Sequence, residues 1–139
     1  MQPYLSFNGN AAEALAFYAQ ALGGKVAFSM TFGESPMGAE TPAEFKNKVM
    51  HASLEARGHT LMASDMPPGM PFEGHKGYSI SVQGKDVAEG EQLFKALSAG
   101  GKVTMPYAPT FWASGFGMLV DKFGVPWMVN VENPAFKPA

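Results

Sequence analysis

The segment Gly23-Gly24-Lys25-Val26 occurs a second time, letter for letter, as Gly100-Gly101-Lys102-Val103. A four-residue match is weak by itself, but its surroundings repeat as well. In each copy a helical pattern ends at the first glycine, and a strand pattern begins at the lysine. Glycine suits the left-handed position that follows a helix. We therefore interpret the 139-residue chain as the duplication of one structural unit.

The residues before each copy also correspond. Residues 4–7 and 79–82 alternate polar and apolar side chains, which is typical of a half-buried strand. Asn10 and Asp86 each have a glutamate three residues later, which is the spacing of a capping box. This spacing predicts that a helix starts soon after each of these strands.

The residues after each copy complete the repeat. Two strands are expected in the first half, at residues 50–56 and 58–63, and two in the second half, at residues 116–120 and 124–129. Residues 66–76, which include Met66-Pro67-Pro68-Gly69-Met70-Pro71, interrupt both helix and sheet patterns. The order of elements is therefore β-α-β-β-β twice.

This order predicts an α+β fold that forms one domain over residues 1–139. We place module one at about 1–65, the linker at about 66–76, module two at about 77–132 and a C-terminal tail at 133–139. Only the first module has the long loop of residues 33–47. A loop of this length is usually functional or mobile, so we expect it to fold over a binding site or to hold a second subunit.

The composition excludes several classes of function. The chain has no cysteine, which excludes disulfides, thiolate metal sites and a cysteine nucleophile. Its formal net charge is -2 without a basic stripe, which argues against nucleic-acid binding. No apolar run approaches the about 18 residues of a membrane span, and the N-terminus lacks a signal-peptide pattern. We expect a cytoplasmic protein that binds neither membranes nor nucleic acid.

Motifs for the common nucleotide and hydrolase sites are also missing. The sequence has no Gly-x-Gly-x-x-Gly after a strand and no Walker pattern, although it has 16 glycines. It has no Gly-x-Ser-x-Gly elbow for a nucleophilic serine. Asp121, in the turn Asp121-Lys122-Phe123-Gly124, is interpreted as a turn former and not as a catalyst.

Four motifs resemble the vicinal oxygen chelate superfamily (glyoxalase I, bleomycin-resistance proteins and extradiol dioxygenases), and more closely its PhnB-like branch. They are Pro3-Tyr4-Leu5-Ser6-Phe7, His51-Ala52 with Leu61-Met62-Ala63-Ser64-Asp65, Phe111-Trp112-Ala113-Ser114-Gly115-Phe116-Gly117, and Asp121-Lys122-Phe123-Gly124-Val125-Pro126-Trp127-Met128-Val129-Asn130. The resemblance implies a glyoxalase-like cupped mixed sheet with the helices outside and a small-molecule pocket within. It also implies a homodimer in which modules can exchange between chains.

The same resemblance implies a divalent metal held by His and Glu side chains on the first and last strands of each module. Those positions hold Gln2 (or Pro3 after a one-residue shift), Met62, Gly77 and Met128, and none offers an imidazole or a carboxylate. We therefore expect neither a metal site nor a cofactor.

A divalent metal at a relocated site is the alternative. His51 and Glu55 alternate on one strand face, but they are about 13 Å apart along the strand, too far to share an ion. A further ligand would have to come from Asp65 or His59.

Strand alternation gives the residues expected to line the small-molecule pocket. His51 with Glu55 or Asp65 is the candidate acid–base pair, because histidine titrates near neutral pH and a carboxylate can fix its tautomer. Trp112 is expected at the wall or lid of the pocket, where the glycines after it let its ring cover a cavity. The expected ligand-binding residues are Tyr4, Ser6, His51, Ser53, Met62, Ser64, Ser79, Trp112, Met128 and Asn130.

Three functions stay open at this point. The first is a dimeric protein that binds a small molecule without the usual metal. The second is a metal-dependent lyase, isomerase or dioxygenase with relocated ligands. The third is a resistance-type protein that sequesters a flat aromatic compound without changing it. Whether the protein is an enzyme is left undecided by the sequence.

Overall fold

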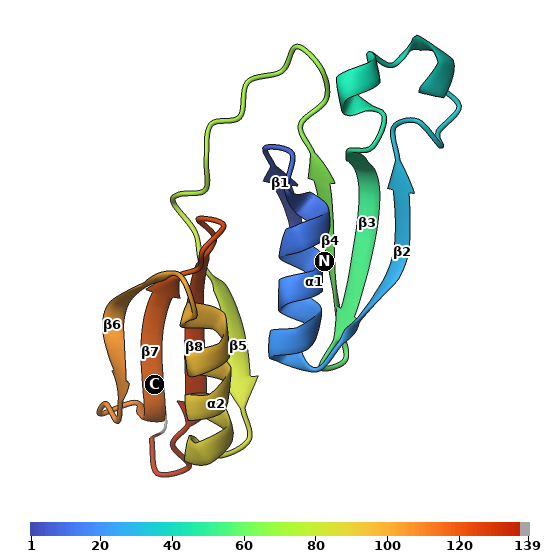
Figure 1. The fold of residues 1–139 in the computed structure, drawn as a ribbon. Helices are drawn as coiled ribbons and strands as arrows, with labels where there is room; N and C mark the ends of the chain where they lie inside the picture. Colours follow the sequence, from blue (N-terminus) through green and yellow to red (C-terminus); the bar gives the residue numbers. More distant parts are fainter. Residues whose placement is uncertain (137–139) are drawn as a thin grey trace. The chain divides into compact units, whose positions relative to one another are not determined.

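The structure, a computed structural model, describes residues 1–136, so residues 137–139 of the predicted tail lie outside the described residues. The chain divides into two compact units, Met1–Gly74 and a second unit that begins at His75 (Figure 1). Each unit has its own sheet and helix, and each is described by itself here.

The N-terminal unit has the predicted β-α-β-β-β order. Its elements are β1 (Tyr4–Phe7), α1 (Ala11–Leu22), β2 (Lys25–Thr31), β3 (Val49–Ala56) and β4 (His59–Asp65). The strand order is β1-β4-β3-β2, with β1 parallel to β4 and the other pairs antiparallel. The extra loop between β2 and β3 contains two 3-10 turns, Gly38–Glu40 and Ala43–Phe45.

The C-terminal unit repeats this arrangement. Its elements are β5 (Ile80–Gly84), α2 (Val87–Ser98), β6 (Lys102–Ala108), β7 (Ala113–Val120) and β8 (Pro126–Glu132). The strand order is β5-β8-β7-β6, and only β5 and β8 pair in parallel. The α+β fold of two β-α-β-β-β modules is therefore confirmed, whereas the shared cup stays a prediction.

In each unit one helix packs on one face of the sheet, and the apolar side chains are buried between them. On β3 and β4 the buried residues alternate with part-exposed ones, as the period of a strand requires. Among residues 1–136, no α-helix of the same unit covers the opposite face of either sheet. The buried residues of the two helix-covered faces include Leu5, Leu15, Tyr18, Leu54 and Ala63 in the first unit and Val82, Leu97, Leu119, Trp127 and Val129 in the second.

The start of α1 differs from its prediction. Asn10 makes no side-chain capping bond. Instead, the carboxylate of Asp65 at the end of β4 accepts hydrogen bonds from the backbone N–H groups of Gly9 (2.9 Å) and Ala11 (3.0 Å). It also accepts one from Val49 N–H at 2.8 Å. Sequence spacing missed this cap because its acceptor lies more than fifty residues away along the chain.

The start of α2 follows its prediction closely. Asp86 Oδ1 accepts a hydrogen bond from Glu89 N–H at 2.8 Å, as an N-cap should. The Glu89 carboxylate reaches back to the N–H of Lys85, one residue before the cap, at 2.9 Å. The capping interaction at Asp86 is therefore confirmed.

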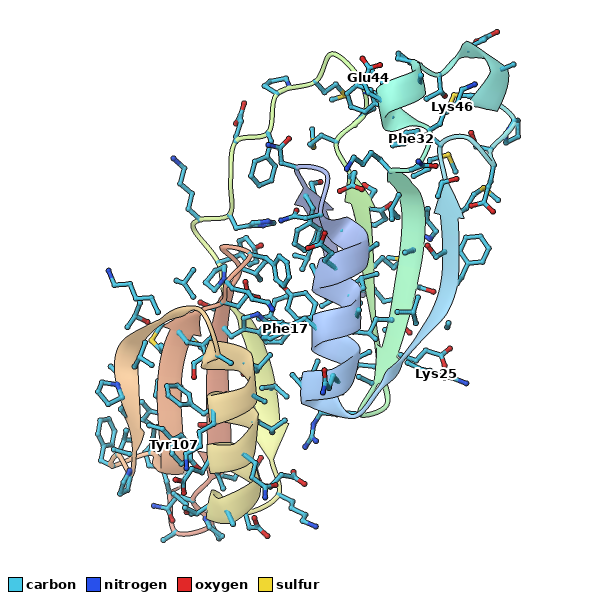
Figure 2. All side chains as sticks on the ribbon, in the orientation of Figure 1. Phe17, Lys25, Phe32, Glu44, Lys46 and Tyr107 are labelled. Carbon is cyan, nitrogen blue, oxygen red and sulfur yellow. The ribbon has the colours of Figure 1, made fainter. Side chains whose placement is uncertain are left out.

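Three glycines of the C-terminal unit make room for two aromatic rings on the helix-covered face. A Cβ atom on Gly90 or Gly115 would collide with the Tyr107 side chain, and one on Gly117 would lie 2.5 Å from Phe94 Cε1. Tyr107, labelled in Figure 2, donates a hydrogen bond from its hydroxyl to Val87 C=O at 2.9 Å. Gly115 and Gly117 thus serve packing beneath the sheet, and not the movement of a ring over a cavity as the sequence suggested.

None of the helices formed by residues 1–136 combines the length and apolar character that crossing a membrane requires.

Candidate functional site

The uncovered face of the N-terminal sheet carries all six of the predicted pocket residues of that unit. Cross-strand register places paired residues on the same face, so this face can be followed strand by strand. We call it the N-terminal open face; it consists of Tyr4, Ser6, Phe28, Met30, His51, Ser53, Glu55, Thr60, Met62 and Ser64.

Tyr4 and His51 form the polar centre of this face. The Tyr4 hydroxyl lies 2.8 Å from His51 Nδ1, which is a hydrogen bond, and the two ring centroids are 5.5 Å apart. Tyr4 comes from β1 and His51 from β3, on either side of β4. The bond engages Nδ1, and no other described residue bonds to Nε2, so Nε2 is available to a ligand.

Phe28 completes the cluster from the edge strand. Its ring centroid lies 6.0 Å from that of His51, and its side chain is 47% exposed, as is that of Tyr4. The imidazole therefore lies between two exposed aromatic rings. Such a surface offers apolar contact from the rings and directed hydrogen bonds from the imidazole and the hydroxyl.

Sequence alternation alone does not find Phe28, because a register shift falls between Val26 and Phe28. Val26 pairs with Leu54 on the helix-covered face, whereas Phe28 pairs with Ser53 on the open face. A bulge of this kind re-aims the side chains that follow it. Without it, simple alternation would place Phe28 beneath the helix.

The structure separates the candidate acid–base residues. Asp65 is 2% exposed and lies on the helix-covered face, where its carboxylate accepts three backbone N–H groups. The predicted pairing of Asp65 with His51 is therefore wrong. Glu55 is on the same face as His51 but exposed at the far end of β3, where it pairs in register with Lys25 and Thr60. Of the three candidates, only His51 belongs to the cluster on the open face.

The remaining predicted pocket residues belong to the C-terminal unit. Met128 and Asn130 lie on the uncovered face of its sheet, where Asn130 Nδ2 donates to Gln83 Oε1 at 2.9 Å. Trp112 packs edge-to-face on Phe116, with centroids 5.3 Å apart. Ser79 is part-exposed and precedes β5 instead of lying within it. A single pocket shared by both sets of residues stays a prediction.

Asp121 has the structural role expected from the sequence. Its Oδ1 accepts from the N–H groups of Phe123 (2.8 Å) and Val125 (3.1 Å), and its Oδ2 accepts from Trp127 Nε1 at 2.8 Å. Gly124 has a φ of 88°, as this turn requires.

The chemistry of the residues does not fit the divalent metal that the fold implies. Met62 and Met128 lie on the uncovered faces, opposite Tyr4 and Ser81 in register, and neither supplies nitrogen or anionic oxygen. Within residues 1–136, no three His, Asp or Glu side chains come close enough to hold one ion. The relocated set of His51, Glu55, Asp65 and His59 is thus not brought together.

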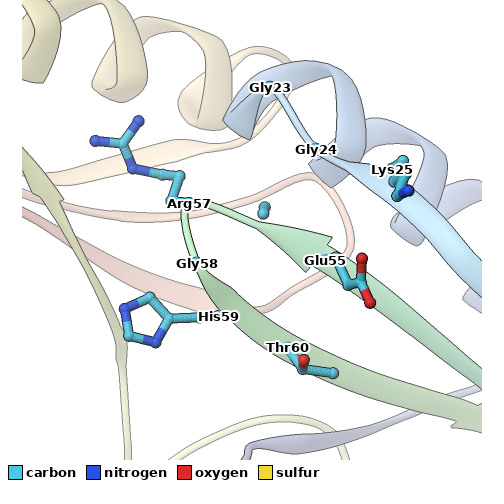
Figure 3. Close-up of a pocket in the computed structure, with 9 residues that line it drawn as sticks. Gly23, Gly24, Lys25, Glu55, Arg57, Gly58, His59 and Thr60 are labelled. Carbon is cyan, nitrogen blue, oxygen red and sulfur yellow. The ribbon is translucent and has the colours of Figure 1, made fainter.

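A separate shallow cavity of about 650 Å³ lies beside the turn between β3 and β4 (Figure 3). The turn residues Arg57 and Gly58 both have positive φ, 54° and 79°, which is typical of a two-residue hairpin. The cavity shares only Glu55 and Thr60 with the N-terminal open face, and none of its lining residues is Phe, Tyr or Trp. Its lining residues are Gly23, Gly24, Lys25, Glu55, Ala56, Arg57, Gly58, His59 and Thr60.

Comparison with known proteins gives concordant matches over nearly the whole chain. A family model described as 3-demethylubiquinone-9 3-methyltransferase matches residues 1–130. Protein YjdN of Escherichia coli (strain K12) is 39% identical over 140 residues, which cover 94% of either chain. The crystal structure of protein PA1353 from Pseudomonas aeruginosa is 52% identical, with a TM-score of 0.87 and coverage of 95% of this chain and 96% of that one.

More distant structures share the fold. The PhnB protein from Bacillus cereus is 24% identical, with a TM-score of 0.78 and coverage of 94% of this chain and 98% of that one. Glyoxalase/bleomycin resistance/dioxygenase proteins match at lower identity.

Proposed function

The chain belongs to the 3-demethylubiquinone-9 3-methyltransferase family, the PhnB-like branch of the glyoxalase superfamily, and from that premise we propose a small-molecule-binding function. The ligand is a ring-containing organic molecule with at least one polar substituent. It binds on the N-terminal open face, and it binds without the divalent metal usual in the superfamily.

One observation carries this proposal, namely the Tyr4–His51 hydrogen bond beside the exposed ring of Phe28. A buried Tyr–His hydrogen bond would be an ordinary structural contact. Here, however, Tyr4 and Phe28, the two aromatic residues that flank His51, are both about half exposed. A ligand ring can stack on them, and its polar substituent can bond to His51 Nε2. Ser53 and Ser64, both part-exposed on the neighbouring rows, supply hydroxyl groups for further polar contacts.

The reaction named in the family description finds no support in the residues. A methyl-transfer enzyme must hold a methyl donor, and the sequence lacks the glycine-rich loop after a strand that holds a nucleotide-type cofactor. Asp65 lies on the other face of the sheet, and Glu55 lies four residues from His51 at the far end of β3. No described carboxylate therefore hydrogen-bonds to His51 to orient it for acid–base work. Binding is therefore the function that the site supports best.

The test uses 4-hydroxybenzoate as the probe, because it combines one ring with two polar substituents. An NMR titration of the intact protein should shift the backbone signals of β1, β3 and β4 around Tyr4, His51 and Met62. The variants His51→Ala and Tyr4→Phe should weaken binding, whereas His59→Ala, in the exposed hairpin of the same unit, should not.

Two results would contradict the proposal. Chemical-shift changes centred on the hairpin cavity would show that the probe binds there and not on the open face. Equal affinity of His51→Ala and the native protein for the probe would show that His51 does not take part in binding. Mass spectrometry of the compound that stays bound to the natively purified protein tests whether the protein is an enzyme. Recovery of an unaltered compound supports sequestration, and recovery of a converted compound indicates an enzyme.

A further inference from the structure

Three methionines line up across the uncovered face of the C-terminal sheet. Met105 on β6 pairs in register with Met118 on β7, and Met118 pairs with Met128 on β8. Ser81 on β5 ends the row beside Met128. Paired residues point to the same face of a sheet, so the three thioethers share one surface.

The row is accessible to a ligand in its own unit. Met105 is 41% exposed, and Met118 and Met128 are part-exposed, whereas the residues that alternate with them on β7 and β8 are buried. These methionines therefore do not fill the core of the unit, which lies on the helix-covered face.

The spacing of the row allows the three sulfur atoms to converge. Neighbouring strands lie about 4.8 Å apart, so the outer two Cα atoms are about 10 Å apart. The thioether sulfur lies three bonds beyond Cα, on the order of 4 Å away, on a side chain with freely rotating bonds. Two outer sulfurs that lean inward can meet the central one around an ion with metal–sulfur bonds of about 2.3 Å.

Thioether sulfur is a soft donor, which among biological metals favours Cu(I) over Zn²⁺, Mg²⁺ or Mn²⁺. The chain has no cysteine to compete for such an ion. Asn130, whose amide lies on the same face, donates a hydrogen bond to Gln83. We propose that Met105, Met118 and Met128 form a binding site for one soft monovalent cation, Cu(I), on the C-terminal sheet.

The duplication supplies an internal comparison. The equivalent row of the N-terminal sheet is Phe28, Ser53, Met62 and Tyr4, joined by the same register. It has one thioether where the C-terminal row has three. The proposal therefore predicts that the C-terminal row binds the ion and that the N-terminal row does not, and it does not depend on the ligand proposed for His51.

Silver nitrate is the probe, because Ag(I) is a soft monovalent cation that does not change oxidation state under these conditions. The intact protein, labelled with ¹³C at the methionine methyl groups, is titrated with Ag(I) and followed by NMR. One equivalent should shift the methyl signals of Met105, Met118 and Met128. The signals of Met37 and Met70, which lie outside the helices and strands and are 54% and 57% exposed, should not move.

The matched variants are Met118→Leu and Met70→Leu. Leucine keeps the volume of methionine and removes the sulfur, so both proteins should fold. Met118→Leu should weaken Ag(I) binding at least about tenfold. Loss of a residue that only supports a metal ligand already weakens metal binding by about tenfold or more, and Met118 is proposed as a direct ligand. Met70→Leu should bind as the native protein does. Unchanged affinity in Met118→Leu, equal shifts of all methionines, or no binding to the native protein would each overturn the proposal.

Discussion

Asp65→Asn should destabilise the N-terminal unit by about 3 kcal/mol, because this carboxylate holds three backbone segments together. Its Oδ1 accepts from Gly9 and Ala11 at the start of α1, and its Oδ2 accepts from Val49 at the start of β3. Asparagine keeps one acceptor oxygen and replaces the other by an NH₂ group. That group faces the Val49 N–H, so two donors meet in a buried place.

The magnitude follows from two effects. A hydrogen bond to a charged group contributes about 1.5–3 kcal/mol, and a buried donor left unsatisfied costs about 1–3 kcal/mol. Together they give a loss of about 3 kcal/mol, which is a large part of the free energy of unfolding of a typical domain, about 5–15 kcal/mol. The free energy of unfolding is measured by urea denaturation with circular dichroism. Hydrogen exchange of the Val49 amide reports on this bond directly.

Asp86→Asn is the matched control, since it makes the same chemical change at an exposed N-cap, where asparagine is as good as aspartate. Its unfolding free energy should stay within about 0.5 kcal/mol of the native value. A cost below about 1 kcal/mol for Asp65→Asn would refute the structural role. Loss of ligand binding without loss of stability would return Asp65 to the catalytic candidates.

Two further predictions test the helices of the two units. Asp86→Ala should lower the free energy of unfolding, measured by urea denaturation, by about 1 kcal/mol, because it removes the hydrogen bond from Glu89 N–H. Asn10→Ala should leave the free energy of unfolding nearly unchanged, because Asn10 makes no capping bond. Equal losses of stability in the two variants would contradict this assignment. Burial, followed by the nearby carboxylates of Glu91 and Asp86, raises the pKa of Tyr107 above its usual value near 10. Since the folded state then holds this proton more tightly than the unfolded state, stability is complete below pH 10 and falls as the pH rises through the folded pKa. Burial and then the charge of Asp121 also raise the pKa of Tyr78. Ultraviolet titration of tyrosinate should therefore show two late-titrating groups, of which only the Tyr78 group remains in Tyr107→Phe. An unchanged late-titrating amplitude in that variant would count against the assignment.

The sequence predicted the fold well because its repeat lies in local features. The glycines after the helices have the expected positive φ, 71° at Gly23 and 75° at Gly100. Alternation also predicted correctly that His51 and Ser53 share one strand face, and the residues between and after them, Ala52 and Leu54, are buried on the other. These features depend on residues within a few positions of each other, which is the range over which pattern reasoning works.

The predictions that failed depend on contacts distant in the sequence. Nothing near Asp65 in the sequence indicates that it caps a helix on the other side of the unit. Likewise, the sequence around Gly115 suggests a flexible position, because it does not show that the Tyr107 side chain occupies the space where a side chain at Gly115 would lie.

The two uncovered faces differ in chemistry although the backbone that builds them is the same. A register shift follows Val26 in β2 and Val103 in β6, at corresponding places of the repeat. In both strands it turns the next large side chain, Phe28 or Met105, from the helix-covered face to the open face. That side chain therefore contributes nothing to the core of its unit, and core packing does not determine whether it is aromatic or a thioether. One open face has a ring beside an imidazole, and the other has three sulfurs. If the two binding proposals hold, 4-hydroxybenzoate should shift NMR signals of the N-terminal sheet, and Ag(I) should shift those of the C-terminal sheet.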